Sequence, residues 1–288
     1  MINPLSLSSF KIEMLGKNYE TGDNLILGTA TAFFYDFKDQ IYLVTNWHNI
    51  TGKNALTNQP LNQDSALPHS LSLYLHYSTQ MDNGDSAVFW DKTYILDLYD
   101  RNDEDNVPIW YEHPIHGCKV DVVAIPLEET IQSLKDKSIA AVPVNCKSLQ
   151  LFDFQILTGM DAFLLGYPLG LVGGGQLPIW KRGSVASELI VDIDKLPKYL
   201  IDTATTKTGM SGSPIFIKSN GFIIQKGKTG IEEMIMPSSF TFGGIYSGRT
   251  QLQYYGENMF PDLAIAWKET AIIEIIEGQK KSEYKFYG

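Results

Sequence analysis

The chain has 288 residues, of which 44% are hydrophobic and 19% are charged, and its formal net charge is −10. This length and composition can bury a large core, which argues against disorder and fits a single two-lobed unit spanning residues 1–288. Lysine and arginine form no basic stripe, so we expect no nucleic-acid partner, because clustered cations supply most of that affinity. No apolar run reaches about 18 residues, so we also expect no membrane partner.

The N-terminal segment and the small number of cysteines indicate in which cellular compartment we expect the protein. Residues 1–6 lack the basic and apolar regions of a secretory signal, and Cys118 and Cys146 are the only cysteines. We therefore expect a cytoplasmic protein with two free thiols. His113 and His116 lie close to Cys118, but no fourth ligand follows at a zinc-site spacing. We expect no metal and no cofactor.

Short apolar runs rich in strand-forming residues recur along the chain, with turn signals between them. Because no helical periodicity separates most of them, they indicate an all-β protein. Near the end, residues 263–276 have helical spacing and Asp262 is a candidate cap, so we expect a C-terminal α-helix over residues 262–278. The expected strands are residues 32–35, 41–45, 71–77, 120–126, 162–165, 200–203, 214–217 and 241–246.

The second expected strand, residues 41–45, runs into a short polar segment that contains His48. A histidine at the end of a strand can reach a cleft, and histidine titrates near neutral pH, which suits a general base. A capping or surface histidine is the alternative at this position.

Asp121 stands at the front of the apolar run Val120 to Pro126. A buried carboxylate is costly unless it is hydrogen-bonded, and an imidazole N–H would be a partner that also fixes the tautomer of a base. An aspartate at an exposed strand end is the alternative.

The segment Gly209 to Pro214 places Ser211 between glycines just before an apolar strand. A serine that attacks a carbonyl needs a tight turn whose N–H groups converge on the oxyanion, and glycine permits such a turn. We therefore expect Ser211 to be the nucleophile and the N–H groups of Gly209 and Ser211 to form the oxyanion hole. A plain hairpin turn is the alternative.

The order His48, Asp121, Ser211 is that of chymotrypsin-type serine proteases and not that of subtilisins or α/β-hydrolases. Over roughly residues 25–275, the chain resembles the trypsin-like peptidase superfamily, in particular its bacterial members without disulfides. The resemblance rests on the segments Gly28 to Phe34, Leu43 to His48, Asp121 to Ile125 and Gly209 to Pro214.

The resemblance implies a fold of two antiparallel Greek-key β-barrels followed by the C-terminal helix. The N-terminal lobe, residues 10–135, would carry His48 and Asp121, and the C-terminal lobe, residues 150–260, would carry Ser211. The active site would lie between the two lobes.

A further match, Gly243 to Arg249, resembles the superfamily strand that pairs with the substrate backbone. The resemblance implies that Ser247 faces Asp121, and that Ser247, Gly248 and Arg249 line the primary specificity pocket. A core strand with a glycine bulge is the alternative.

Two positions depart from the digestive members of the superfamily. Met210 stands where zymogen-activated members carry an aspartate that pairs with a newly formed N-terminus, so we expect no activation by that ion pair. Thr205 falls where trypsin has the acidic base of its pocket. We expect Thr205 to be a substrate-binding residue. Because threonine is not acidic, we expect the protein to have no strict preference for substrates with lysine or arginine before the cut.

These residues together predict a serine endopeptidase that hydrolyses a polypeptide substrate through an acyl-enzyme. Two alternatives stay open at this point. One is a catalytically idle or partner-gated peptide-binding module of the same fold, and the other is an esterase that uses the same triad. A regulatory protein partner is expected in the gated case, because cytoplasmic proteases need restraint.

Overall fold

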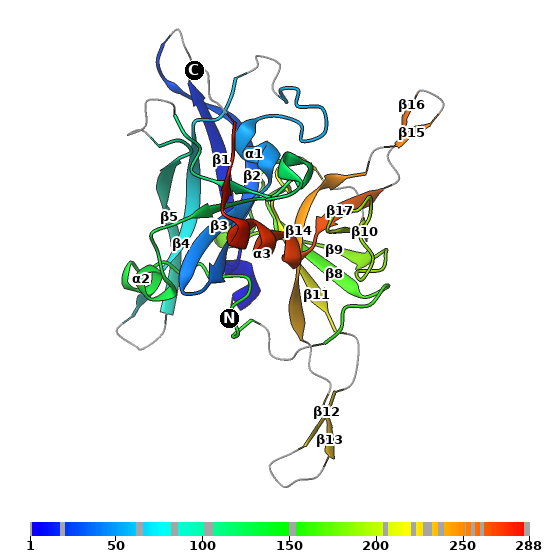
Figure 1. The fold of residues 1–288 in the computed structure, drawn as a ribbon. Helices are drawn as coiled ribbons and strands as arrows, with labels where there is room; N and C mark the ends of the chain where they lie inside the picture. The colour runs from blue at the N-terminus through cyan, green and yellow to red at the C-terminus, as the bar shows by residue number, and fades with distance from the viewer. Residues whose placement is uncertain are drawn as a thin grey trace.

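The computed structural model describes residues 2–17, 21–61, 66–81, 86–100, 106–149, 154–203, 207–219, 223–226, 232–235, 239–250, 252–254, 257–259 and 262–284. Strand is the main secondary structure of these residues, as predicted. The strands form two β-rich halves side by side, and the C-terminal helix packs against both (Figure 1).

The first half is an eight-stranded sheet in the order β18-β6-β7-β3-β2-β1-β4-β5. The last strand of the chain, β18, pairs with β6, so the C-terminal segment returns to this sheet. The strands are β1 Phe10–Lys17, β2 Asn24–Phe37, β3 Gln40–Thr45, β4 Ser70–Gln80, β5 Ser86–Asp97, β6 Tyr111–Glu112, β7 Val123–Pro126 and β18 Lys280–Lys281. The short helices of this half are η1 Pro4–Leu7, α1 Trp47–Thr51, η2 Gly117–Lys119 and α2 Ile131–Asp136.

The first half differs from the closed barrel that the family resemblance implied. Its outer strands, β5 and β18, are not paired with each other in the part of the chain that the structure describes. The edge strand β18 has only two residues, so it offers too few hydrogen bonds to close the sheet onto β5. The edge strand β5 accordingly leaves Phe89, Trp90 and Ile95 exposed, at 48%, 45% and 59%.

The second half is a closed antiparallel barrel in the order β10-β17-β14-β11-β8-β9, so one of the two expected barrels is present. Buried apolar side chains such as Leu164, Ile215 and Ala264 fill its interior. The barrel strands are β8 Asp161–Gly166, β9 Ile179–Val185, β10 Lys198–Thr203, β11 Pro214–Lys218, β14 Phe240–Arg249 and β17 Leu263–Trp267. The 3-10 helices η3 Pro168–Gly170 and η4 Gly174–Gln176 precede β9, and two hairpins, β12 Ile223–Lys226 with β13 Glu232–Ile235 and β15 Leu252–Tyr254 with β16 Glu257–Met259, extend from the barrel (Figure 1).

The C-terminal helix α3 spans Glu269–Gly278 and begins later than predicted. Residues 263–267 form the strand β17, because Ala264 and Ala266 alternate into the barrel interior with a period of two. Asp262 therefore precedes a strand and caps no helix. No helix among the described residues is long and apolar enough to cross a membrane.

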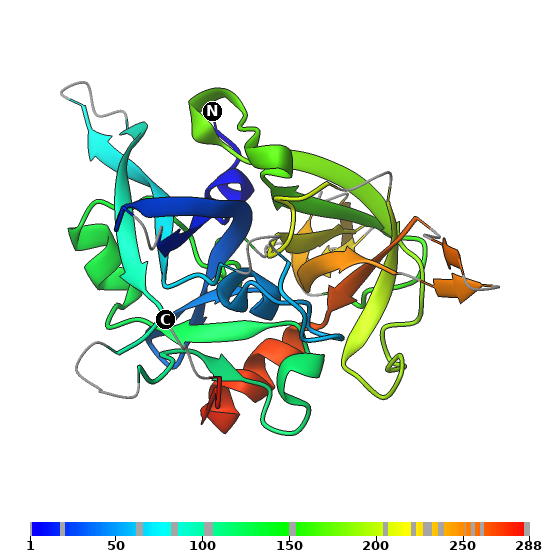
Figure 2. The same cartoon turned by 90° about the horizontal axis from the view of Figure 1, so that it is seen from above.

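An apolar cluster joins the two halves. Val44 and Val122 of the first half pack in one cluster with Phe216 and Trp267 of the barrel and with Ile272 of α3. Figure 2 shows α3 beneath the line where the sheet and the barrel meet. Since burial of each such side chain contributes roughly 1.5–3 kcal/mol, this cluster holds the two halves in one relative position.

His76 on β4 makes stability depend on pH. Its side chain is buried and Nε2 donates to the Gly175 carbonyl oxygen at 3.2 Å. Burial lowers the pKa of His76 below its ordinary value of 6.5. Below that pH the unfolded chain binds a proton that the folded chain resists, so the free energy of unfolding decreases as the pH falls.

We predict that acidification from about pH 7 to about pH 5.5 destabilises the wild type more than His76→Gln, by up to about 1.4 kcal/mol per pH unit. Glutamine keeps a donor for Gly175 and does not titrate. Urea unfolding at the two pH values measures the difference, and equal losses in both proteins would contradict the prediction.

Candidate active site

His48 lies in α1, a one-turn helix that directly follows β3 and ends at Gly52 in the left-handed conformation. Trp47 anchors this helix, because its buried indole Nε1 donates to Glu112 Oε1 at 2.7 Å. The His48 side chain faces a cavity and is 18% exposed. Because Trp47 fixes the helix α1, the His48 imidazole lies at the cavity wall.

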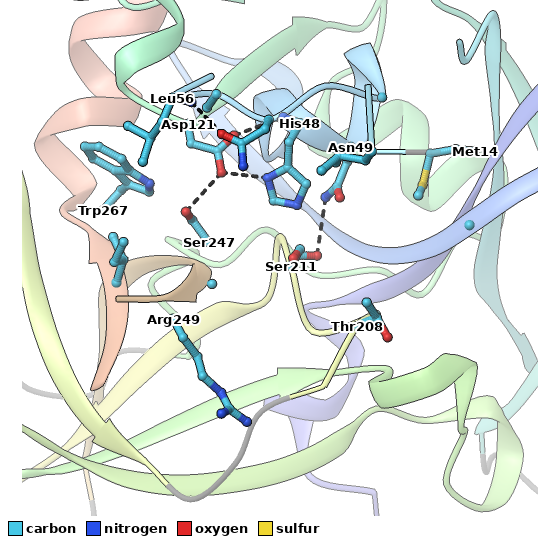
Figure 3. Close-up of a pocket in the computed structure, with 18 of the residues that line it drawn as sticks. Met14, His48, Asn49, Leu56, Asp121, Thr208, Ser211, Ser247, Arg249 and Trp267 are labelled. Carbon is cyan, nitrogen blue, oxygen red and sulfur yellow. Dashed lines mark hydrogen bonds and ion pairs between the residues drawn. The ribbon is translucent and has the colours of Figure 1, made fainter. Parts of the chain in front are cut away.

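The Asp121 carboxylate binds His48 twice (Figure 3). Asp121 Oδ2 lies 2.6 Å from His48 Nδ1, and Asp121 Oδ1 accepts the His48 backbone N–H at 2.9 Å. Ser247 Oγ also donates to Oδ2, at 3.0 Å. Three donors offset the cost of burying this side chain, which is 9% exposed. Because the Nδ1 proton is directed at Asp121, His48 Nε2 is left as the acceptor that a general base requires.

The main chain of Asp121 is held as firmly as its side chain. The Asn46 amide donates to the Asp121 carbonyl oxygen at 2.7 Å, and Val120 and Val122 are fully buried on either side. Asp121 therefore precedes β7 as a buried residue, not at an exposed strand end.

Ser211 lies on a turn that requires glycine at two positions. Gly209 and Gly212 have φ of 93° and 86°. A Cβ at Gly209 would lie 2.1 Å from the Tyr167 carbonyl oxygen, and one at Gly212 would lie 1.9 Å from the Thr31 carbonyl oxygen. No other residue type fits either position without moving the backbone.

Met210 anchors this turn from below. Its side chain is fully buried in the barrel core, and its carbonyl oxygen accepts Ser213 Oγ at 2.6 Å. Met210 therefore makes apolar contacts at the position where the sequence predicted that no activating ion pair would form.

The first half of the chain holds the Ser211 carbonyl group. The Thr31 N–H donates to it at 2.9 Å and the Asn49 side-chain amide at 3.4 Å. Among the described residues, no acceptor takes the N–H of Gly209 or of Ser211. The assignment of these two N–H groups to an oxyanion hole stays a prediction.

Ser211 and His48 line the same cavity, and Figure 3 shows the serine beside the imidazole ring. Within the described part of the chain, no hydrogen bond joins Ser211 Oγ to His48 Nε2. Catalytic hydrogen bonds are often long before substrate binds and tighten in the substrate complex. The structure thus places His48, Asp121 and Ser211 at one cavity, but the contact between Ser211 Oγ and His48 Nε2 is not formed among the described residues.

The cavity has a volume of about 1000 Å³ and is walled by both halves of the chain. Thr205, predicted to bind substrate, lies outside the described residues. Apolar side chains from Met14, Leu27 and Leu56 form much of the wall on the side of the first half. Seven sequence-predicted residues line the cavity: His48, Asp121, Gly209, Ser211, Ser247, Gly248 and Arg249.

Sequence reasoning missed three positioning residues, Thr31, Asn46 and Asn49. All three are buried and polar, and each binds the main chain of Asp121 or of Ser211. A signal existed for two of them, since Asn46 and Asn49 flank His48 directly after an apolar strand, where unpaired side-chain amides would be costly.

The histidine cluster near Cys118 has a structural role. His113 Nε2 lies 2.7 Å from Glu274 Oε2, and His113 Nδ1 accepts the N–H groups of Ile115 and His116. Burial lowers the pKa of His113. Among the described residues, no group of three or more side chains is placed to hold a metal ion.

No protein-family model matches this chain, and no curated protein matches it. Among solved structures, the inactive form of a mutant of Rv3671c from M. tuberculosis H37Rv is 13% identical, covers 94% of this chain and 86% of its own, and has a TM-score of 0.42. The protease Anisep from Arthrobacter nicotinovorans is 15% identical, covers 93% of both chains, and has a TM-score of 0.45. At these identities and TM-scores neither likeness assigns a family.

We predict that Gly209→Ala slows labelling of Ser211 by a fluorophosphonate at least about 10²-fold, the cost of losing one oxyanion donor. Gly159→Ala is the matched control, because Gly159 also has a positive φ, 84°, but nothing lies within 4 Å of an added Cβ. The second-order labelling rate is measured for both variants. Equal rates would show that the Gly209 turn does not serve the reaction.

Proposed function

We propose that this protein is a serine endopeptidase in which Ser211 is the nucleophile, His48 the general base and Asp121 the residue that orients the base. One observation carries the proposal: the contact of 2.6 Å between His48 Nδ1 and Asp121 Oδ2, in the cavity that also contains Ser211 on its glycine turn. A buried carboxylate, an imidazole and a turn-borne hydroxyl in this order are the parts of acyl-transfer chemistry.

In the first step, Ser211 Oγ attacks the peptide carbonyl carbon while its proton passes to His48 Nε2. The new C–O bond displaces the carbonyl π electrons onto oxygen, and this oxyanion accepts the N–H groups of Gly209 and Ser211. The C–N bond then breaks as His48 returns the proton to the leaving amine. Water repeats the sequence on the acyl-enzyme and releases the acid and free Ser211.

Asp121 supports both proton transfers without accepting a proton itself. Its Oδ2 holds the Nδ1–H of His48, so Nε2 faces the reaction, and its negative charge stabilises the imidazolium that forms. Ser247 donates to the same oxygen and so limits rotation of the carboxylate.

A peptide substrate is favoured by the edge of β14 that lines the cavity. The pairing of β11 with β14 ends at the pair Pro214 and Ile245. Beyond it, in the part of the chain that the structure describes, no strand pairs with the β11-facing edge of Ser247 and Gly248. An extended peptide can add to such an edge as a further strand, which places its carbonyl groups beside Ser211.

A second candidate is a peptidase or peptide-binding module whose site is completed only by a partner. The specific observation in its favour is that Ser211 Oγ has no hydrogen bond to His48 Nε2 among the described residues. In this candidate, binding of a regulatory protein or of substrate moves the serine turn relative to α1.

We predict that a fluorophosphonate labels the purified protein at Ser211, and that Ser211→Ala and His48→Ala reduce labelling by about 10⁴-fold. The adduct is located by peptide mass spectrometry. A folded protein that is labelled only in the presence of lysate would favour the partner-gated candidate. Labelling combined with turnover of p-nitrophenyl esters but of no peptide would favour an esterase.

We predict that Asp121→Asn also lowers the labelling rate by about 10⁴-fold, because an asparagine amide would favour the wrong tautomer of His48. Asp194→Asn is the matched control, since Asp194 lines the same cavity but pairs with Lys198 at 2.8 Å. Asp194→Asn should stay within a few-fold of the wild type. A near-normal rate for Asp121→Asn would remove Asp121 from the proposed mechanism.

A further inference from the structure

One end of the six-stranded barrel carries three cations that the proposed triad does not use: Lys181, Lys207 and Arg249. This is the end at which Ser211 lies, because the turn before β11 packs there against the main chain that follows β8. Gly209 on that turn closely approaches the Tyr167 carbonyl oxygen, and the Leu169 N–H donates to the Thr208 carbonyl oxygen at 2.6 Å.

The register of β9 places Lys181 on the interior face of the barrel. Lys181 is paired directly with Leu164 of β8, and residues directly opposite each other in an antiparallel pair project from the same face. Leu164 is fully buried in the barrel core. Lys181 is thus the cation of β9 that points inward, whereas the next residue, Arg182, is exposed and binds Asp161 at 2.7 Å.

Arg249 is on the same face at the same end. It is paired with Ala264 of β17, whose side chain is buried in the barrel core, and it lines the cavity that contains Ser211. Figure 3 shows its guanidinium group pointing away from His48 and Asp121. Its Nη1 lies 3.5 Å from the exposed Asp262 carboxylate, a contact that water screens and that contributes little.

Arg249 and Lys207 both lie close enough to Lys181 to repel its charge. Burial lowers the pKa of Lys181, and the charges of Arg249 and Lys207 lower it further. Lys207 is exposed and lies four residues before Ser211 on the chain that enters the nucleophile turn. A carboxylate placed among like charges of this kind relieves their repulsion and gains charge-assisted hydrogen bonds.

We infer that this end of the barrel receives the side chain that precedes the cleaved bond, and that it selects a carboxylate, so that the protein cleaves after glutamate or aspartate. The inference rests on the proposed peptidase function and adds its substrate class. Lys181 on the interior face of the barrel and Arg249 at the cavity wall would each form an ion pair with this carboxylate.

The test uses fluorogenic peptides that are identical except for glutamate, glutamine, alanine or lysine before the cut. We expect kcat/KM for glutamate to exceed that for glutamine by at least about 10-fold, the size of a charge-assisted hydrogen bond. Lys181→Met should reduce this ratio by about 10-fold to 100-fold. Arg182→Met is the matched control and should keep the wild-type ratio, because Arg182 is the adjacent cation on the outer face.

Arg249→Met supplies a second test at the cavity wall, and it should lower the same ratio. The inference is overturned if the wild type cleaves after glutamine, alanine or lysine as well as after glutamate, or if Lys181→Met and Arg182→Met change the ratio equally. Fluorophosphonate labelling separates the two proposals, because it does not depend on the residue before the cut. Labelled Ser211 without a preference for glutamate refutes only this inference, and a folded protein that is never labelled refutes both.

Discussion

The buried carboxylate of Asp121 is the group on which the proposed site depends. It lies at the seam between the two halves, where it accepts two hydrogen bonds from His48 in the first half and one from Ser247 in the barrel. A buried carboxylate is stable only while such donors are in place. Because the donors belong to α1 and β14, the hydrogen bonds to Asp121 hold these two elements together. Val120 and Val122, on either side of Asp121 in the chain, belong to the apolar cluster that joins the two halves.

The nucleophile turn is tied to the same seam by uncharged groups. Thr31 of β2 donates its N–H to the Ser211 carbonyl oxygen and its Oγ1 to the Gly209 carbonyl oxygen, at 2.9 and 2.8 Å. Thr45 in turn donates to the Thr31 carbonyl oxygen at 2.8 Å, so β3, which leads to His48, is part of the same network. The serine belongs to the barrel by sequence, but strands of the first half set its position.

The sequence indicated three residues that the structure places at one cavity, but it did not indicate that the first sheet stays open in the described residues. The local pattern that marked each of these residues is a polar residue at the end of an apolar strand. The order in which they follow one another along the chain distinguishes between the folds that carry such residues. The start of α3 was wrong because residues 263–267 fit both a helical and a strand period, and only the pairing of β17 with β10 and β14 decides between them. The inward position of Lys181 depends on strand register, which no local pattern shows.

A crystal structure of the protein with a phosphonate bound covalently to Ser211 would test the central claim most directly. If the three residues form one acyl-transfer site, a phosphoryl oxygen lies about 2.7–3.1 Å from the nitrogen atoms of both Gly209 and Ser211, and His48 remains bound to Asp121. A phosphoryl oxygen directed away from these N–H groups, or a His48 ring turned away from Asp121, would contradict the mechanism.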